Sequence, residues 1–268
     1  MGQSVVHAAR AMLLETARWL DRARALCVSL GVGTLRLRDV RAGVEDNWSG
    51  FVTDAAEIES GLDPAEAAVV ARFIGVNDRV LVVGCGTGRD VIPLVRMGCQ
   101  VVGIDPVAHA VGIARRELAA RGLAASIVEG YFEDAPVPGT FDVILFSNLC
   151  YSYIPERERR TKLLRKAAGL LSPGGKILVT HLAARSPFRT RMLWSMRAAA
   201  RLTRSDWHPE AGDHLVPING ARARFGFEHF FAPGELEREA ADAGLLVLPH
   251  REHPHARPLL VLTTPHAD

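Results

Sequence analysis

The chain has 268 residues and a net charge of +2 with histidine neutral, and 48% of its residues are hydrophobic against 23% charged. This is an ordinary globular composition, in a chain long enough to bury a sizeable core without disulfides. The small net charge gives no overall field that would attract nucleic acid or an anionic membrane. No apolar run reaches the length of a membrane span, and the N-terminus lacks the layout of a signal peptide.

The cysteines give no sign of a zinc site or a disulfide framework, because no two of them form a CxxC pair. They are Cys27, Cys85, Cys99 and Cys150. We therefore expect a reducing, cytoplasmic setting. Nearly all basic residues are arginine and alanine is frequent, which suggests a bacterial source with a GC-rich genome.

The N-terminal part is predicted to be a helical cap covering residues 1–63. A helix is expected over 6–30, where apolar residues recur at spacings of three and four. These residues are Leu13, Ala17, Leu20, Ala23 and Cys27. Residues 31–62 are mixed in character and are expected to be irregular, with short helical pieces.

A second helix is predicted to begin at Asp63 and to end near Gly75. Asp63 can cap it, Pro64 suits its first turn, and Glu66 stands where a capping box places its acidic residue. With this helix begins the predicted α/β domain, residues 64–268.

From residue 79, apolar strands alternate with helices. Strands are expected over 79–84, 100–104, 125–129, 141–146, 176–181, 245–250 and 258–263. Helices are expected over 88–97, 108–121, 156–171 and 233–243. Strands this apolar are covered on both faces, which is typical of a parallel sheet flanked by helices. The turn-rich stretch between the last two strands predicts a closing antiparallel hairpin.

The sequence RVLVVGCGTGRD (79–90) places Gly84, Gly86 and Gly88 directly after the first strand. Glycine allows positive φ and leaves room for a ligand close to the backbone, and the following helix offers free N–H groups. The spacing is GxGxG, unlike a dinucleotide fingerprint or a Walker loop. A tight turn without a ligand is the alternative interpretation.

Asp105 ends the second strand, in VVGIDP. An acidic residue at this strand tip can accept hydrogen bonds from both hydroxyls of a ribose. The alternative is that it caps the helix from residue 108.

Five segments in order resemble the motifs of class I S-adenosylmethionine (SAM)-dependent methyltransferases. They are RVLVVGCGTGRD, VVGIDP, VEGYFEDAP (128–136), FDVILFSNL (141–149) and LLSPGGKILVTH (170–181). The likeness covers about residues 79–181 and is weaker over 228–245. It implies a Rossmann-like α/β fold whose seven-stranded sheet is mostly parallel with an antiparallel last strand. It also implies SAM as the cofactor.

The resemblance implies a cofactor site spread over these motifs. Glycines 84, 86 and 88 would lie against the methionine part, Asp105 would hold the ribose, and Phe132 would pack near the adenine. Asn148 would lie near the amino acid end or the methyl group. The same motifs contribute Cys85, Pro106, Tyr131 and Glu133 to the cofactor-binding set. Pro173, Gly174 and Gly175 would form a turn before the fifth strand.

Two positions depart from the family pattern. Val82 stands where an acidic residue is frequent, and Tyr131 follows Gly130 where aspartate is common. Asp90 is a candidate to replace the first charge. Candidates to replace the second are Glu129, Glu133 and Asp134, with binding through backbone and stacking alone as the alternative.

The long insert 182–232 is expected to cover the ligand edge as a substrate lid. A helix with Ser186 as its cap and Pro187 in its first turn is predicted within it. Arginines at 189, 191, 197, 201 and 204 make it basic, either as a solvated face or as a collar for an anionic substrate.

The catalytic candidates are His181, His229 and Tyr151. His181 ends the fifth strand and is the best candidate for a general base. Tyr151, with Tyr153, follows the fourth strand and would orient the substrate. For each residue a purely structural role is the alternative. No metal is expected, because His250, His253 and His255 lie in a predicted turn without cysteine or a carboxylate cluster.

The sequence thus predicts methyl transfer from SAM to an oxygen, nitrogen or sulfur atom of a small molecule, in bacterial specialised metabolism. The helical cap and the insert suit an enclosed pocket better than a macromolecular surface, so no nucleic acid or membrane partner is expected. Two alternatives remain: other chemistry on SAM, such as cyclisation or elimination, and binding of SAM without turnover. The oligomeric state is open.

Overall fold

The structure is a computed structural model that describes residues 2–51, 58, 61–62, 67–68, 70–184, 190–217, 225–250 and 257–265. Two compact units divide the chain. One contains Met1–Asp39 and Pro187–Ala211, and the other contains Val40–Ser186 and Gly212–Asp268. This division differs from the predicted boundary at residue 63, because residues 40–51 belong to the same unit as the large sheet.

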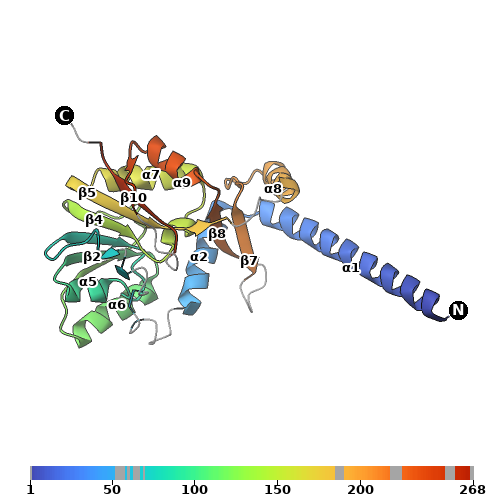
Figure 1. Cartoon of the computed structure of the whole chain (residues 1–268), viewed down its shortest axis with the longest axis horizontal. Helices are drawn as coiled ribbons and strands as arrows, with labels where there is room; N and C mark the ends of the chain where they lie inside the picture. Colours follow the sequence, from blue (N-terminus) through green and yellow to red (C-terminus); the bar gives the residue numbers. More distant parts are fainter. Residues whose placement is uncertain are drawn as a thin grey trace. The chain divides into compact units, whose positions relative to one another are not determined.

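The first unit contains two helices, α1 (Gly2–Gly33) and α8 (Thr190–Thr203) (Figure 1). Helix α1 extends beyond the predicted 6–30 at both ends. Helix α8 lies within the predicted helix of the insert, whose cap residues Ser186 and Pro187 fall outside the described residues. The two helices pack closely at Gly33, where an added Cβ would lie 2.2 Å from the carbonyl oxygen of Met196.

The second unit is built on a seven-stranded sheet in the order β3-β2-β1-β4-β5-β10-β9. Its strands are β1 (Arg79–Val83), β2 (Gln100–Asp105), β3 (Ser126–Glu129), β4 (Phe141–Phe146), β5 (Leu171–Thr180), β9 (Leu246–Val247) and β10 (Leu259–Thr263). Strands β1 to β5 pair in parallel, whereas β10 is antiparallel to both β5 and β9. The predicted mostly parallel sheet with an antiparallel last strand is confirmed.

Helices cover both faces of this sheet, as its apolar strands predict (Figure 1). On one face α5 (Val91–Arg96) and α6 (Ala108–Ala120) share a core with alternate strand residues such as Val80 and Val82. On the other face α7 (Arg157–Ala168) and α9 (Glu235–Asp242) share a core with the intervening residues Leu81 and Val83. The helix predicted from Asp63 lies mostly outside the described residues.

The prediction that residues 31–62 are irregular with short helical pieces is wrong over 37–51, because one 15-residue helix, α2, spans Leu37–Phe51. Its first turn has half of a capping box, since the Asp39 carboxylate accepts a hydrogen bond of 2.9 Å from the Arg36 N–H. Gly43 lets the helix approach β8 (Phe225–Phe231), because a Cβ there would lie 1.9 Å from the Phe225 carbonyl oxygen. Tertiary packing thus helps to hold a segment of mixed composition in a helix.

Other boundaries also differ from prediction. Part of the insert forms a three-stranded sheet, in which β6 (Leu182–Ala183) and β7 (Asp213–Pro217) flank β8. The strand predicted over 245–250 is reduced to β9. Strand β5 begins before the predicted Pro-Gly-Gly turn, and its pairing with β4 shifts register between Phe141 and Val143. A short 3-10 helix, η1 (Cys150–Tyr153), follows β4.

Candidate active site

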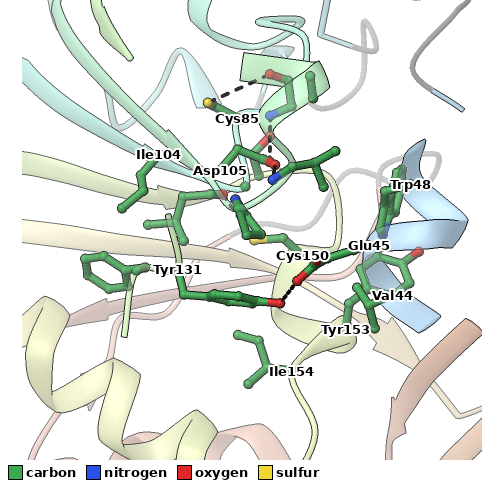
Figure 2. Close-up of a pocket in the computed structure, with 18 of the residues that line it drawn as sticks. Val44, Glu45, Trp48, Cys85, Ile104, Asp105, Tyr131, Cys150, Tyr153 and Ile154 are labelled. Carbon is green, nitrogen blue, oxygen red and sulfur yellow. Dashed lines mark hydrogen bonds between the residues drawn. The ribbon is translucent and has the colours of Figure 1, made fainter. Parts of the chain in front are cut away.

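A pocket lies at the carboxyl ends of β1, β2 and β4, where ligands bind in open α/β sheets. It encloses about 1340 Å³ of free space, part of which is open to solvent. Its wall comes from the glycine turn after β1, the tips of β2 and β4, the segment after β3, η1 and helix α2 (Figure 2).

The glycine turn is open to a ligand at Gly86. Gly86 has φ +50°, and a Cβ added there would meet nothing within 4 Å. At Gly84 a Cβ would lie 2.6 Å from that of Cys150, so this glycine lets η1 approach the turn. Both glycines line the pocket together with Cys85, whereas Gly88 does not and instead packs against Ala114 of α6.

Asp105 is buried, and both of its carboxylate oxygens face the pocket side of the turn. They accept hydrogen bonds of 2.9 Å from the N–H groups of Gly86 and Val107. Burial raises the pKa of Asp105, these two bonds oppose the rise, and nearby Glu45 adds to it. Each oxygen keeps a second lone pair, so the carboxylate can still accept hydrogen bonds from a diol. Pro106 lies beside it in the wall.

The segment after β3 brings Tyr131, Phe132 and Glu133 into the pocket wall. Phe132 is buried and meets Phe146 edge to face, at 6.0 Å between ring centroids. The Tyr131 hydroxyl donates a hydrogen bond to Glu45 of α2 (Figure 2). Burial, followed by this bond, raises the pKa of Tyr131 to about 12, so the phenol is neutral at physiological pH.

Helix α2 supplies pocket residues that no sequence motif indicated. The guanidinium of Arg41 lies 3.9 Å from the centre of the Tyr131 ring and 3.5 Å from the Glu133 carboxylate. Glu45 and Trp48 also line the pocket. They escaped the sequence reasoning because the segment was taken as irregular, and because these contacts join residues more than 80 positions apart.

At the two positions that depart from the family pattern, the structure shows whether another acidic residue takes the place of the missing one. Val82 is fully buried in the sheet core, so that position offers no charge to the pocket. Asp90 is buried beneath the turn, where it accepts hydrogen bonds from Ser147 and Arg89, and it does not line the pocket. Of the candidates near Tyr131, Glu133 lines the pocket and pairs with Arg159 at 2.9 Å, whereas Glu129 and Asp134 do not line it.

The end of β4 reaches the pocket through Asn148 and Cys150. Asn148 and Leu149 both have positive φ, of 42° and 66°, a conformation that non-glycine residues adopt rarely and that is concentrated at functional sites. Burial and the charge of Asp105 raise the pKa values of the Cys85 and Cys150 thiols well above their ordinary range. Both cysteines therefore stay neutral and are poor nucleophiles.

None of the three predicted catalytic side chains lines the pocket. Tyr151 is fully buried, and its hydroxyl donates a hydrogen bond of 2.9 Å to Glu239. The His181 ring meets Phe231 edge to face at 5.5 Å. His229 is buried between two carboxylates. The positions of these three residues in the sequence predicted that they lie near one edge of the sheet. The direction of each side chain, however, depends on neighbours remote in sequence. Tyr153 does line the pocket.

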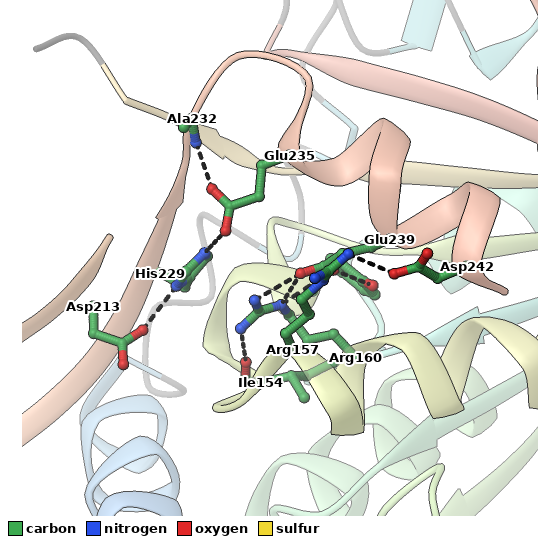
Figure 3. A network of polar contacts seen from close by, with 10 residues as sticks. Ile154, Arg157, Arg160, Asp213, His229, Ala232, Glu235, Glu239 and Asp242 are labelled. Atoms are coloured by element: carbon green, nitrogen blue, oxygen red, sulfur yellow. Dashed lines mark hydrogen bonds and ion pairs between the residues drawn. The ribbon is translucent and has the colours of Figure 1, made fainter. Parts of the chain in front are cut away.

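His229 belongs to a buried network of polar groups (Figure 3). Its Nδ1 lies 2.7 Å from Asp213 and its Nε2 lies 3.2 Å from Glu235. Burial lowers the pKa of His229, but the two carboxylate contacts together outweigh burial and leave this pKa raised. The pKa of Glu235 is lowered because its bonds to His229 and Ala232 outweigh its burial.

The stability of the protein should therefore depend on pH through this pair. The raised pKa of His229 contributes stability fully below its ordinary value of 6.5, and this is lost as pH rises through the raised value. The lowered pKa of Glu235 contributes above 4.5, and this is lost as pH falls. We expect urea unfolding to show that the pair contributes most to the free energy of unfolding between pH 4.5 and pH 6.5. A His229→Gln variant should lose the decline above pH 6.5, and an unchanged decline would contradict this.

Of the histidines weighed as metal ligands, His253 and His255 lie outside the described residues. No helix in the described part of the chain is both long and apolar enough to cross a membrane.

The sheet order, with a glycine turn after β1 and a buried acid at the tip of β2, is that of a class I methyltransferase fold. Comparison with known proteins agrees with this class. Residues 80–175 match a family model described as a methyltransferase domain. Residues 80–175 thus form a methyltransferase domain of the class I SAM-dependent type, and SAM is its cofactor.

Individual relatives are distant. Ubiquinone biosynthesis O-methyltransferase of Rhizobium etli is 28% identical over 197 residues, which are 73% of this chain and 69% of the relative. Cypemycin N-terminal methyltransferase of Streptomyces sp is 35% identical, but the match covers 36% of this chain and 38% of the relative. The glycopeptide N-methyltransferase MtfA, solved with SAM, has 18% identity and a TM-score of 0.52, covering 77% and 89% of the two chains. The last likeness shows the fold alone.

Proposed function

We propose that this methyltransferase transfers the methyl group of SAM to an oxygen, nitrogen or sulfur atom of a small organic molecule. The observation that carries the proposal is that the pocket is lined on several sides. Helix α2 and η1 line it together with the glycine turn and Asp105. A pocket walled in this way admits a compact acceptor better than a polymer.

The residues present fit the cofactor. The backbone at Gly86 is free of neighbours for a close contact, and Asp105 would accept hydrogen bonds from the ribose hydroxyls. Tyr131 and Phe132 would flank the adenine. SAM supplies an electrophilic methyl on a positively charged sulfur, and the lone pair of the acceptor forms the new bond while the S–CH₃ electron pair stays on sulfur.

The acceptor side of the pocket is aromatic and apolar. Trp48 and Tyr153 meet edge to face, with ring centroids 5.0 Å apart, and Ile154, Pro155 and Leu163 continue the wall. Such a surface favours an acceptor with a flat or apolar body. Among the pocket-lining residues that the structure describes there is no histidine, which favours a nucleophile that needs little general-base help, such as an amine.

The names of similar proteins mention different methyl acceptors. One relative is named for O-methylation in ubiquinone biosynthesis, another for methylation at the N-terminus of cypemycin, and a structural neighbour for N-methylation of a glycopeptide. These names support acceptors made in bacterial biosynthesis, including specialised metabolism. We also propose that the acceptor is anionic and that the insert 182–232 acts as a lid. The protein is proposed to act in the cytoplasm.

The test is a turnover assay with methyl-labelled SAM and a panel of aromatic amines, phenols and thiols, analysed by mass spectrometry. A product heavier than the acceptor by one CH₂ unit, formed in step with S-adenosylhomocysteine, supports the proposal. Saturable SAM binding with methylation only of protein or RNA in a cell extract would overturn it.

The contact between Glu45 and Tyr131 is expected to hold α2 against the cofactor wall. Tyr131→Phe and Glu45→Gln should each raise the KM for SAM about five- to tenfold, since a hydrogen bond to a charged group contributes about 1.5 kcal/mol. The double variant should be no worse than the worse single variant, because both changes remove one contact. Additive losses would show that the two residues act separately. Steady-state kinetics at saturating acceptor measures these values.

A further inference from the structure

The apolar side of helix α1 is uncovered along most of its length. Met12, Leu13, Trp19 and Leu20 are each 66–69% exposed, and Leu26 is 52% exposed. Helix α8 covers this side only at its C-terminal end. It packs at Gly33, seven residues after Leu26, and the nearby residues Ser29 and Val32 are buried. Between Met12 and Leu26 the helix presents an apolar surface for which the unit itself provides no partner among its described residues.

Most of the exposed large apolar residues of α1 follow a heptad pattern, and only Leu14 and Val28 among them lie at the outer f position. In heptads lettered a to g, the d positions are Met12, Trp19 and Leu26, and the a positions are Ala9, Thr16, Ala23 and Leu30. Leu13, Leu20 and Cys27 fall at e, next to this seam. The Thr16 hydroxyl donates to the Met12 carbonyl of its own helix, which satisfies it within an apolar seam. A spacing of 3.5 residues indicates a helical partner.

We propose that α1 pairs with α1 of a second copy of this chain as an antiparallel coiled coil. In the register that places Trp19 opposite Thr16 of the second copy, every large d residue faces a smaller a residue. Met12 then faces Ala23, and Leu26 faces Ala9. A parallel pair would instead place Trp19 against Trp19 and alanine against alanine. Successive pairs of side chains would then be alternately too large and too small to pack well.

The charges beside the seam fit the same register. Glu15 and Arg22 are both at g, and antiparallel pairing brings Glu15 of each copy beside Arg22 of the other. Leu13 meets Leu20 of the second copy on the other side of the seam. Glu15 also contacts Arg18 of its own helix at 2.5 Å, and its carboxylate has lone pairs for both partners. A membrane surface would require neither this charge pairing nor the match of large with small residues.

Sedimentation equilibrium of the full chain tests the pairing. We expect a mass twice the 29.1 kDa of one chain, falling toward one chain on dilution. Glu15→Arg and Arg22→Glu should each raise the dissociation constant about tenfold, since each breaks both ion pairs of the dimer and adds repulsion. The double variant should restore the dissociation constant to within about threefold, because the pairs are re-formed with reversed sign. Leu20→Glu should give a single chain.

Several results would overturn the proposal. A mass of one chain at every concentration would do so, as would a double variant no tighter than the single ones. Vesicles of anionic phospholipid separate the membrane alternative. If they bind a monomeric protein, with Glu15→Arg binding more tightly and Arg22→Glu less tightly, α1 is a membrane-surface helix. All four variants change exposed residues, and a circular dichroism melt controls for folding.

Discussion

Replacing Asp105 by asparagine is expected to weaken SAM binding about a hundredfold. The buried carboxylate accepts one backbone N–H on each oxygen and has lone pairs left for two ribose hydroxyls. Hydrogen bonds to a charged acceptor contribute about 1.5–3 kcal/mol each, and a hundredfold loss corresponds to about 2.7 kcal/mol. An amide keeps only one acceptor oxygen and turns its NH₂ group toward a backbone donor. Calorimetric titration with SAM measures the change in Kd.

Glu129→Gln is the matched control for this prediction. Glu129 pairs in register with Asp105 at the tip of the neighbouring strand, but it does not line the pocket. Its replacement removes a similar charge at a neighbouring strand end but removes no contact in the pocket. The Kd for SAM should therefore stay within about twofold of the original. An Asp105→Asn variant that melts normally and binds SAM as tightly as the control would remove Asp105 from the cofactor site.

Removing the Glu239 side chain is expected to cost the most stability of any change considered. Arg160 and Glu239 are both fully buried and contact each other at 2.7 Å (Figure 3). Glu239 also accepts a hydrogen bond from the Tyr151 hydroxyl. Glu239→Ala leaves a guanidinium buried opposite an empty space. Breaking such a pair by removing one partner costs about 3–5 kcal/mol. Urea unfolding, followed by circular dichroism, measures this free energy.

The same helix offers a matched control in Asp242. Its contact with Arg157 at 2.5 Å is about half exposed, so Asp242→Ala should cost less than about 1 kcal/mol. Replacing both buried partners, as in Arg160→Met with Glu239→Leu, should cost less than Glu239→Ala alone, because no unpaired charge remains. Equal losses for Glu239→Ala and Asp242→Ala would contradict a special role for the buried pair.

The buried pair also bears on the pocket. Arg160 donates to the carbonyl of Ile154, which lines the pocket, and Tyr151 lies in η1 between Cys150 and Tyr153. Tyr151, predicted as catalytic, thus holds η1 from behind through Glu239. Its pKa is raised well above the ordinary value, by burial and then by the Glu239 charge, so it stays neutral in this position.

The strands of the large sheet, and the edge at which Gly86 and Asp105 lie, could be predicted from local sequence patterns. Alternating residues of β1 divide between the two cores, and this period of two is a local property readable from the residues. Gly86 and Asp105 follow directly from strand ends, because parallel strands place their carboxyl ends on one edge. For the same reason the ordered motifs sufficed to predict the strands from β1 to β5, to within a few residues at most ends.

The elements that close the pocket, and the directions of the candidate bases, depend on contacts between segments that are remote in sequence. Glu45 meets Tyr131 across more than 80 residues, and α2 packs on β8 through Gly43, contacts that no local pattern encodes. His229 lies near the predicted edge, yet it turns into the core because Asp213 and Glu235 satisfy both ring nitrogens there. Periodicity fixes which face of a strand a residue occupies, whereas packing between remote segments fixes its partners, and with them its chemistry.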